Sequence, residues 1–374
     1  MSSLGGRRAL RRYSRHLLIP EIGLAGQERL QRARVLVVGA GGLGSPVLAY
    51  LAAAGVGRIG IVDDDVVDET NLQRQVLFAQ ADVGRAKAAV AAERIVALNP
   101  QVAVDAYPLR FVAANARELV RPYDLVVDAT DSFESRYVVN DAAHLEEKPD
   151  VYGAIFRFDG QVSVFAPEGP CYRCLFPQAP PPGSVPSCSE GGVLGALAGI
   201  VGAWQANEAL KVLLGIGAPL AGRLASIDAL GGRTREFALP RDPECALCGP
   251  AATIRDVAPA LGPPPAAAAA GTELDAADFE AFLARQPEAV ILDVREPHEA
   301  VLGLHARAQH VPASQLEARL HELDSAKTYV VACRLGMRSA WAAQRLAEAG
   351  FRRIYHVKGG LLSLTAAESS FDLY

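Results

Sequence analysis

The sequence has no excess of positive charge. Its 374 residues hold 37 lysines and arginines against 42 aspartates and glutamates, a net charge of −5. This balance excludes a chain built throughout to bind nucleic acid or an anionic membrane surface. Cysteine is also scarce, because six residues are too few for a disulfide scaffold of this length. The chain is instead long enough for two or three packed units.

Little in the sequence would place it in a membrane. The uncharged stretch Gly191–Asn207 is shorter than the roughly 20 residues of a spanning helix and is rich in glycine. It predicts a closely packed internal helix. The basic start of the chain leads only to Leu17–Ile19 before Pro20, so no signal peptide is expected. We predict a cytoplasmic protein. The seven histidines form no metal or triad spacing, and no serine lies in a nucleophile elbow.

Up to about Gly249, short Val/Ile/Leu runs alternate with alanine-rich helical patterns, which is typical of βαβ units. The alternating run Gly160–Phe165 predicts an antiparallel extension. We therefore predict an α/β fold, with a Rossmann-like nucleotide-binding domain of mixed sheet over residues 1–249. The expected strands are Val35–Val38, Ile59–Val62, Val102–Ala106 and Leu125–Asp128, and the expected helices are Leu43–Ala54 and Lys87–Leu98.

A second, smaller α/β domain is predicted over residues 273–374. Residues 250–272 are rich in proline, alanine and glycine and predict a semi-extended linker between the domains. The second domain is expected to contain strands at Ala289–Asp293, Tyr329–Ala332 and Ile354–Val357, and a helix at Ser339–Ala349.

A glycine loop follows the first predicted strand and opens a helix. It contains Gly39, Gly41, Gly42 and Gly44, and Asp63 ends the next strand about twenty residues later. Backbone amides at a helix start receive phosphate, and a carboxylate at a strand end accepts ribose hydroxyls. The pattern predicts a nucleotide site, with a purely structural glycine turn as the alternative.

Polar residues further along favour ATP over a nicotinamide. Charge builds up on the phosphates when the α-phosphorus is attacked, so arginine and lysine side chains and a metal-holding aspartate suit that reaction. Asn71, Arg74, Lys87 and Asp131 supply these groups. Taken singly, Arg74 and Lys87 could equally be solvated surface residues. Asp131 alone could equally be a turn residue. A nicotinamide-dependent oxidoreductase leaves them unexplained but stays the alternative of another class.

Four of the cysteines have the spacing of a metal site. Two CxxC pairs about seventy residues apart predict a tetrahedral structural Zn²⁺ site, because four thiolates close the coordination sphere. A redox dithiol or unligated core cysteines are the alternatives. The four residues are Cys171, Cys174, Cys245 and Cys248.

The remaining two cysteines are candidate nucleophiles. Cys188 lies in a Pro/Gly/Ser-rich loop before the internal helix, where a mobile nucleophile or a spare thiol would fit. Cys333 follows a predicted strand and opens the loop Cys333–Ser339 before a helix. Inward amides, the helix start and Arg334 and Arg338 would stabilise an anionic sulfur there, so we predict an exposed, reactive cysteine of low pKa.

The ordered motifs of the first domain resemble the ubiquitin-activating-enzyme superfamily, in its molybdopterin-synthase and thiamine-biosynthesis adenylyltransferase branch. The resemblance covers about Arg11 to Gly249. It rests on Arg12–His16, Gly39–Gly44, Asn71–Gln75, Asp128–Asp131 and Cys171–Cys174. It implies adenylation of the C-terminal glycine of a small ubiquitin-like sulfur carrier, with the same zinc.

The resemblance also implies individual roles. Gly42, Asp63, Asn71, Arg74 and Lys87 would contact ATP, and Asp131 would hold Mg²⁺. Arg15 would complete the site of the neighbouring subunit in a homodimer, and Cys188 matches a cysteine that some relatives use to take the activated glycine. The chain departs from the family at Ser132, where asparagine is usual.

The second domain resembles a single-domain rhodanese, a sulfurtransferase that carries persulfide sulfur on the cysteine matching Cys333. The resemblance covers about Glu273 to Tyr374 and includes Asp293–Glu296 and Gly359–Leu361. The segment Gly303–Ala308 departs from the usual Gly-His-Ile-Pro-Gly-Ala-like run. An inactive rhodanese fold kept for docking usually lacks the cysteine.

Together the two resemblances predict an adenylyltransferase and sulfurtransferase that converts the carrier's glycine carboxylate to a thiocarboxylate. An upstream persulfide donor such as a cysteine desulfurase would load Cys333. Molybdenum-cofactor biosynthesis is the expected pathway, with thiamine, tRNA thiolation and cysteine synthesis as alternatives. A scaffold that binds a ubiquitin-like partner without catalysis is a further alternative.

Overall fold

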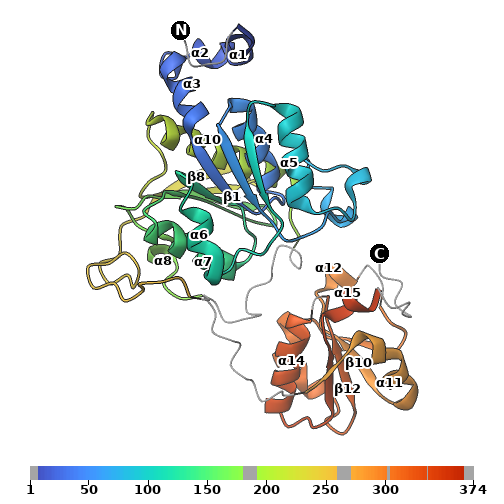
Figure 1. Ribbon diagram of the computed structural model, residues 1–374. Coiled ribbons are helices and arrows are strands. Elements are labelled where there is room, and N and C mark those ends of the chain that lie inside the picture. Colours follow the sequence, from blue (N-terminus) through green and yellow to red (C-terminus); the bar gives the residue numbers. More distant parts are fainter. Residues whose placement is uncertain (1–6, 180–191, 259–270, 301–303, 335, 366–374) are drawn as a thin grey trace. The chain divides into compact units, whose positions relative to one another are not determined.

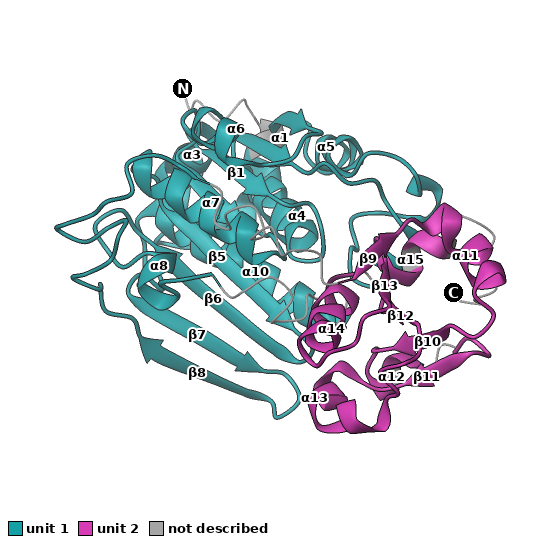
Figure 2. Ribbon diagram, turned by 90° about the horizontal axis from the view of Figure 1, so that it is seen from below, with its two compact units in different colours: residues 1–180, 187–261 teal, residues 181–186, 262–374 magenta. Residues whose placement is uncertain are grey.

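The computed structural model describes residues 7–179, 192–258, 271–300, 304–334 and 336–365. These residues form two compact units, which Figure 2 colours separately. Each unit has its own sheet and its own buried apolar core. The α/β class and the two sheets agree with the sequence prediction.

The first unit is built on an eight-stranded sheet with the strand order β3-β2-β1-β4-β5-β6-β7-β8. The first five strands are parallel, and β6 to β8 continue the sheet in antiparallel pairs, as the alternating run predicted. The strands are β1 (Arg34–Val38), β2 (Arg58–Val62), β3 (Ala103–Tyr107), β4 (Leu125–Asp128), β5 (Asp150–Phe156), β6 (Asp159–Phe165), β7 (Arg223–Asp228) and β8 (Arg233–Ala238).

Helices cover both faces of the parallel part of this sheet (Figure 1). Alternate residues of β1 therefore enter different cores: Val35 and Val37 pack beneath α4, α5 and α10, and Leu36 and Val38 pack beneath α6 and α7. The helices are α1 (Arg7–Arg12), α2 (Ser14–Leu17), α3 (Gly23–Arg32), α4 (Gly44–Ala54), α5 (Lys87–Leu98), α6 (Ala113–Val120), α7 (Phe133–Leu145), α8 (Tyr172–Leu175) and α10 (Gly195–Leu214), with short 3₁₀ helices at Glu69–Asn71 and Gln80–Asp82.

The predicted internal helix is α10, which packs closely against α4. A Cβ atom at Gly202 would lie 2.5 Å from the carbonyl oxygen of Leu43, so a larger residue would push the two helices apart. Among the described residues, no helix combines the length and the apolar character needed to cross a membrane.

The second unit is a five-stranded parallel sheet with the order β11-β10-β12-β13-β9. Its strands are β9 (Thr272–Leu274), β10 (Val290–Asp293), β11 (Ala308–His310), β12 (Tyr329–Ala332) and β13 (Ile354–Val357). Its helices are α11 (Phe279–Arg285), α12 (Pro297–Ala300), α13 (Leu316–Arg319), α14 (Met337–Glu348) and α15 (Gly360–Thr365), with 3₁₀ helices at Ala276–Asp278, Ala313–Gln315 and Leu320–Glu322.

The chain stays packed on the first unit beyond Gly249, where the linker was expected to begin. Ala252 is buried, Val257 packs against the α6–α7 core, and Asp256 forms a 3.4 Å ion pair with Arg117. The burial follows from the apolar side chains in this stretch. Residues 259–270 lie outside the described residues, so the linker and its limits stay a prediction.

Arg307 explains part of the departure from the usual rhodanese sequence in the segment before β11. Its guanidinium donates to the carbonyl oxygens of Gln286, Pro287 and Ala289 at 2.6–2.9 Å. These carbonyls follow the C-terminus of α11, where a cation is favourable and where backbone acceptors need partners. The departure at Arg307 therefore ties this segment to α11.

Candidate functional site

A cavity of about 540 Å³ opens at the carboxyl ends of β1, β2 and β4, the edge at which parallel α/β sheets bind ligands. Its size is within the range of small-molecule sites. Most of the predicted nucleotide-binding residues line it, namely Gly39, Gly41, Gly42, Asp63, Asn71, Arg74, Lys87 and Asp131.

The glycine loop requires glycine for two separate reasons. Gly39 has a φ of +95°, and a Cβ there would lie 2.7 Å from the carbonyl oxygen of Ala129. A Cβ at Gly44, the first residue of α4, would overlap the carbonyl oxygen of Gly39. The loop is thus folded tightly between β1 and α4, and Gly41 and Gly42 bring bare backbone to the cavity wall.

Asp63 is anchored at the end of β2 by two backbone amides. One carboxylate oxygen accepts from Ala40 N–H at 2.7 Å and the other from Asp65 N–H at 3.0 Å. Burial raises the pKa of Asp63, while the Ala40 hydrogen bond and the nearby Lys87 charge oppose that rise. The carboxylate is oriented and suits a ribose hydroxyl.

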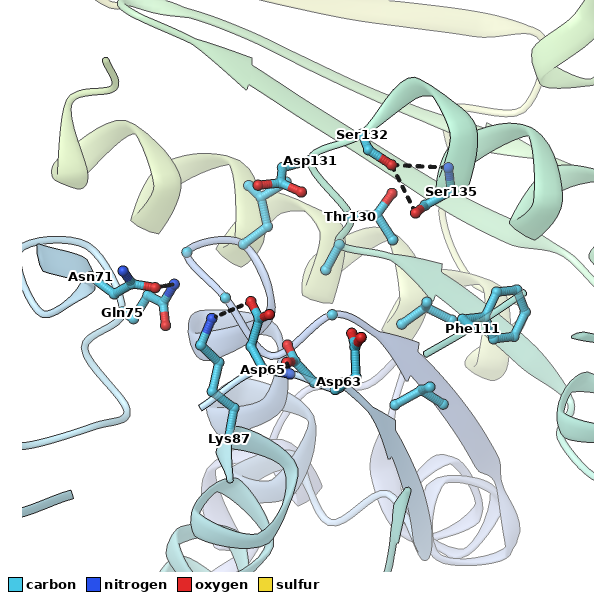
Figure 3. A pocket seen from close by; sticks show the side chains of 18 of the residues that line it. Asp63, Asp65, Asn71, Gln75, Lys87, Phe111, Thr130, Asp131, Ser132 and Ser135 are labelled. Atoms are coloured by element: carbon cyan, nitrogen blue, oxygen red, sulfur yellow. Dashed lines mark hydrogen bonds and ion pairs between the residues drawn. The ribbon is translucent and has the colours of Figure 1, made fainter. Parts of the chain in front are cut away.

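Lys87 lies buried at the first position of α5 with its ammonium group at the cavity. Its Nζ is 2.8 Å from Asp65 Oδ2, and its own N–H donates to Asp65 O at 2.9 Å. Sequence reasoning missed Asp65, although the run Asp63–Asp65 follows a strand. On the same side of the cavity, Gln75 Nε2 donates to Asn71 Oδ1 at 2.8 Å (Figure 3).

The facing side of the cavity comes from the end of β4 (Figure 3). Asp128 is fully buried, and its Oδ1 accepts from Thr130 N–H at 2.9 Å and Thr130 Oγ1–H at 2.7 Å. This turn leaves Asp131 exposed at the cavity wall. Ser132, the departure from the family, is the N-cap of α7 and accepts from Ser135 N–H at 3.0 Å.

Arg136 adds a cation that sequence reasoning did not select. It lies one turn into α7, is 6% exposed and lines the cavity. Burial raises the pKa of Asp128, and the charge of Arg136 opposes that rise. Arg136 lies one helical turn beyond Asp131 and the N-cap residue Ser132, and this spacing could have identified it from the sequence.

Gln205 of α10 joins the end of β4 to the start of the neighbouring strand β5. Its Nε2 donates to Asp128 O at 2.6 Å and to Val151 O at 3.0 Å, and the side chain is fully buried. A Cβ at Gly153 would overlap this side chain, so glycine makes room for it. The amide thus holds two backbone carbonyls, one at the end of β4 and one in β5, through a single buried donor group.

Replacing Gln205 with leucine should lower the stability of the first unit by about 2 kcal/mol, because two buried carbonyls lose their donor. Calorimetry of the full chain should show the corresponding decrease in Tm, about 4–8 °C. Gln80→Leu, at an exposed position, is the control and should change Tm little. Equal stability of the two variants would show that the Gln205 bridge contributes nothing.

The four predicted zinc-site cysteines converge. The Sγ–Sγ distances are 3.6 Å for Cys171–Cys245, 3.3 Å for Cys174–Cys248 and 3.9 Å for Cys171–Cys174, and all four lie within 4.8 Å of one another. A tetrahedral zinc with bonds of about 2.3 Å requires sulfur atoms about 3.8 Å apart. The donor set and its spacing fit Zn²⁺.

The sulfur cluster also receives backbone donors, as metal thiolates commonly do. Asp242 N–H donates to Cys174 Sγ at 3.4 Å. Burial raises the pKa of Cys245, but hydrogen bonds from the amides of Cys248 and Leu247, together with those from the neighbouring thiols, lower it overall. Three of the four cysteines are buried and Cys174 is half-buried, so the cluster is compatible with a bound Zn²⁺.

Replacing Cys174 with serine should remove the metal and destabilise the first unit by at least about 3 kcal/mol. We expect Tm to fall by about 6–12 °C and zinc, measured by elemental mass spectrometry, to be lost from the full chain. Cys333→Ser, in the other unit, should leave zinc content unchanged. Unaltered stability of a zinc-free Cys174→Ser chain would contradict a structural role.

Two predicted catalytic residues of the first domain, Arg15 and Cys188, are absent from the described lining of the cavity. Cys188 lies outside the described residues. Arg15 lies in α2 and is exposed. Both roles stay predictions.

Cys333 lies in the loop between the end of β12 and the start of α14. Its Sγ accepts from Gly336 N–H at 3.1 Å and from Ser339 N–H at 3.2 Å, so two amides converge on the sulfur as expected. The expectation of exposure is wrong, because the residue is fully buried. Gly360 packs so closely on the loop that a Cβ there would overlap Gly336 N, and Leu361 N–H donates to Cys333 O at 2.8 Å.

The arginine charge beside Cys333 is not directed as expected. Arg338 makes two hydrogen bonds to Glu299 of α12, at 2.6 and 2.7 Å. Its positive charge is therefore largely offset by a carboxylate. Sequence reasoning missed Glu299, because nothing in its local pattern indicates a contact 39 residues away.

Comparisons with known proteins agree with this geometry. The ThiF family model matches residues 13–247, and the rhodanese-like domain model matches residues 275–367. A sulfur carrier protein adenylyltransferase of Thermus thermophilus is 58% identical over 66% of this chain and 94% of its own length. A probable adenylyltransferase/sulfurtransferase, MoeZ of Mycobacterium tuberculosis, is 45% identical over 96% of this chain and 93% of its own.

Two further likenesses extend the comparison. The mouse adenylyltransferase and sulfurtransferase MOCS3 is 43% identical over 87% of this chain and 73% of its own length. Among solved structures, Escherichia coli MccB with MccA-N7isoASN has a TM-score of 0.58 at 22% identity, over 66% of this chain and 76% of that one, which shows the fold alone.

These matches confirm an enzyme of the adenylyltransferase and sulfurtransferase class, and they do not support a nicotinamide-dependent oxidoreductase or a scaffold without catalysis. The chain belongs to the ThiF family and carries a rhodanese-like domain after its adenylation domain.

Proposed function

We propose that this enzyme adenylates the C-terminal glycine of a ubiquitin-like sulfur carrier protein and then transfers sulfur to it from Cys333. The observation that carries the proposal is the cavity, where a glycine loop, an oriented Asp63 and the cations Arg74, Lys87 and Arg136 surround space for one nucleotide. The relatives named for sulfur-carrier adenylation support the choice of carrier.

In the adenylation step, a carboxylate oxygen of the carrier attacks the α-phosphorus of ATP. The bond between the α-phosphorus and the bridging oxygen breaks, and pyrophosphate leaves with the electron pair. Negative charge accumulates on the phosphate oxygens, where Arg74 and Lys87 lie ready to stabilise it. Asp63 would hold the ribose and thereby fix the α-phosphorus relative to the attacking oxygen.

Asp131 would hold Mg²⁺ on the ATP phosphates. When bound, the ion would withdraw charge from the phosphate oxygens and make pyrophosphate a better leaving group. An exposed carboxylate at the cavity wall, facing Lys87, suits a hard oxygen-seeking cation.

In the transfer step, the terminal sulfur of a Cys333 persulfide attacks the acyl carbon and AMP leaves. This reaction joins the carrier glycine to Cys333 through an acyl disulfide. Two electrons and protons from a thiol reductant then release the thiocarboxylate and the Cys333 thiol. Alternatively, Cys188 first takes the acyl group as a thioester, with AMP leaving, and the persulfide then displaces Cys188.

The remaining parts of the proposal concern partners. An upstream persulfide donor such as a cysteine desulfurase would load Cys333. The enzyme would act as a homodimer in which Arg15 of one copy reaches the ATP site of the other, in keeping with its exposure and its absence from the described lining of the cavity. Molybdenum-cofactor biosynthesis is the proposed pathway, and a cytoplasmic location is part of the same proposal.

Carrier-dependent exchange of labelled pyrophosphate into ATP tests the first step. We expect exchange with a carrier ending in Gly-Gly, and no exchange when its last glycine is deleted. With a persulfide donor and reductant, the mass of the carrier should rise by one oxygen-to-sulfur replacement. A panel of carriers identifies the pathway, and absence of exchange with every carrier would reject the proposal.

A further inference from the structure

The Glu299–Arg338 pair belongs to the loop of Cys333, because Arg338 directly precedes Ser339, whose N–H donates to the sulfur. The two side chains are only 9% and 11% exposed. Glu299 is itself held, because Glu296 N–H donates to Glu299 Oε2 at 2.8 Å. The carboxylate therefore has one orientation, and it keeps the guanidinium of the loop in a fixed, neutralised pair.

The sulfur of Cys333 meets backbone dipoles rather than that guanidinium's net charge. The two amide donors at 3.1 and 3.2 Å are neutral groups, and the residue is fully buried. A sulfur donor with two negative charges loses its hydration shell when it approaches this buried sulfur, and a nearby cation is needed to offset that loss. A persulfide attached to a thiol carries at most one charge on its terminal sulfur, and two amides suit it.

We propose that Glu299 determines which sulfur donors load Cys333, by favouring thiol-bound persulfides over small dianions such as thiosulfate. The inference rests on the proposed sulfur transfer and makes its donor class more specific. Arg334 remains a second arginine of the loop, so the effect is a shift of preference between the two donor classes.

Both loading reactions use the same nucleophile. A thiol-bound persulfide gives its terminal sulfur to the Cys333 thiolate, the donor S–S bond breaks, and the donor leaves as a thiolate. With thiosulfate, the Cys333 thiolate attacks the outer sulfur, the S–S bond breaks, and sulfite leaves with the electron pair. Each reaction leaves the same Cys333 persulfide, so the two donors can be compared directly.

The test measures kcat/KM of the full chain for thiosulfate, by sulfite release, and for the persulfide of 2-mercaptoethanol, a thiol with no other charged group, by persulfide loading. Glu299→Gln should raise the thiosulfate-to-persulfide ratio by about tenfold or more, because no carboxylate then offsets the positive charge of Arg338. The matched control is Glu296→Gln. This neighbouring carboxylate binds Ser314, and its removal should leave the ratio unchanged.

Arg338→Gln tests the same inference from the other partner and covers the case in which Glu299→Gln fails to fold. It leaves Glu299 negative, so the ratio should fall below that of the natural chain. The role of Glu299 would be overturned by an unchanged thiosulfate-to-persulfide ratio in a folded Glu299→Gln chain, or by a ratio that does not fall in Arg338→Gln. Either result would leave the sulfur-transfer proposal itself standing. A natural chain that loads sulfur from neither donor would overturn the sulfur-transfer proposal with it.

Discussion

Replacing Asp131 with asparagine is expected to reduce carrier-dependent ATP–pyrophosphate exchange by about 10³-fold or more. The substitution keeps the shape of the side chain and removes the charge that would hold Mg²⁺ beside the phosphates. The Thr130 turn and the Ser132 cap, which place residue 131 at the cavity, make no use of that carboxylate. The fold should therefore be retained, with an unchanged Tm.

Glu134→Gln is the matched control for this experiment. It removes an exposed carboxylate from the first turn of α7, three residues from Asp131 and outside the described lining of the cavity. Exchange should stay within about twofold of the natural chain, since an exposed charge contributes little. If Asp131→Asn retained most of the exchange at saturating Mg²⁺, the metal-holding role of Asp131 would be rejected.

The second large effect is expected at Cys333 and should separate the two activities. Cys333→Ala should abolish thiocarboxylate formation, a loss of about 10³-fold or more, because the atom that carries the sulfur is gone. Pyrophosphate exchange should stay within about twofold of the natural rate, because adenylation uses residues of the other unit. Mass measurement of the carrier and the exchange assay report the two results independently.

The neighbouring Met337→Leu serves as the control within the same loop. Met337 is 43% exposed, and a similar apolar side chain there should preserve both activities. Thiocarboxylate formed at the natural rate by Cys333→Ala would show that sulfur reaches the carrier without this residue. Loss of exchange in Cys333→Ala would instead show that the two steps are not separable.

The nucleotide site was predictable because its signals are local. Gly39 to Gly44 lie between a strand and a helix, and the backbone there admits only glycine at the two ends. Asp63 and Asp131 each follow a parallel strand, and parallel strands end at one edge of a sheet. The sequence could therefore indicate that these side chains meet, although not how they are held.

Two of the residues that sequence reasoning missed, Gln205 and Glu299, act through distant partners. Gln205 reaches the end of β4 from a helix 77 residues later, and Glu299 binds Arg338 from 39 residues earlier. Neither belongs to a local motif, and a single buried glutamine or glutamate looks the same in a sequence as an exposed one. Their partners depend on how helices are laid over the sheet.

The two α/β sheets, the glycine loop, each of the two CxxC pairs and the amide-lined loop of Cys333 could be predicted from the sequence, because each depends on strand order or on residues close in the chain. Only the tertiary structure decided that Cys333 is buried, that Asp65 holds Lys87 and that Glu299 offsets Arg338. Burial and ion pairing are set by which elements pack together, so the charge beside each reacting atom could not be read from the chain alone.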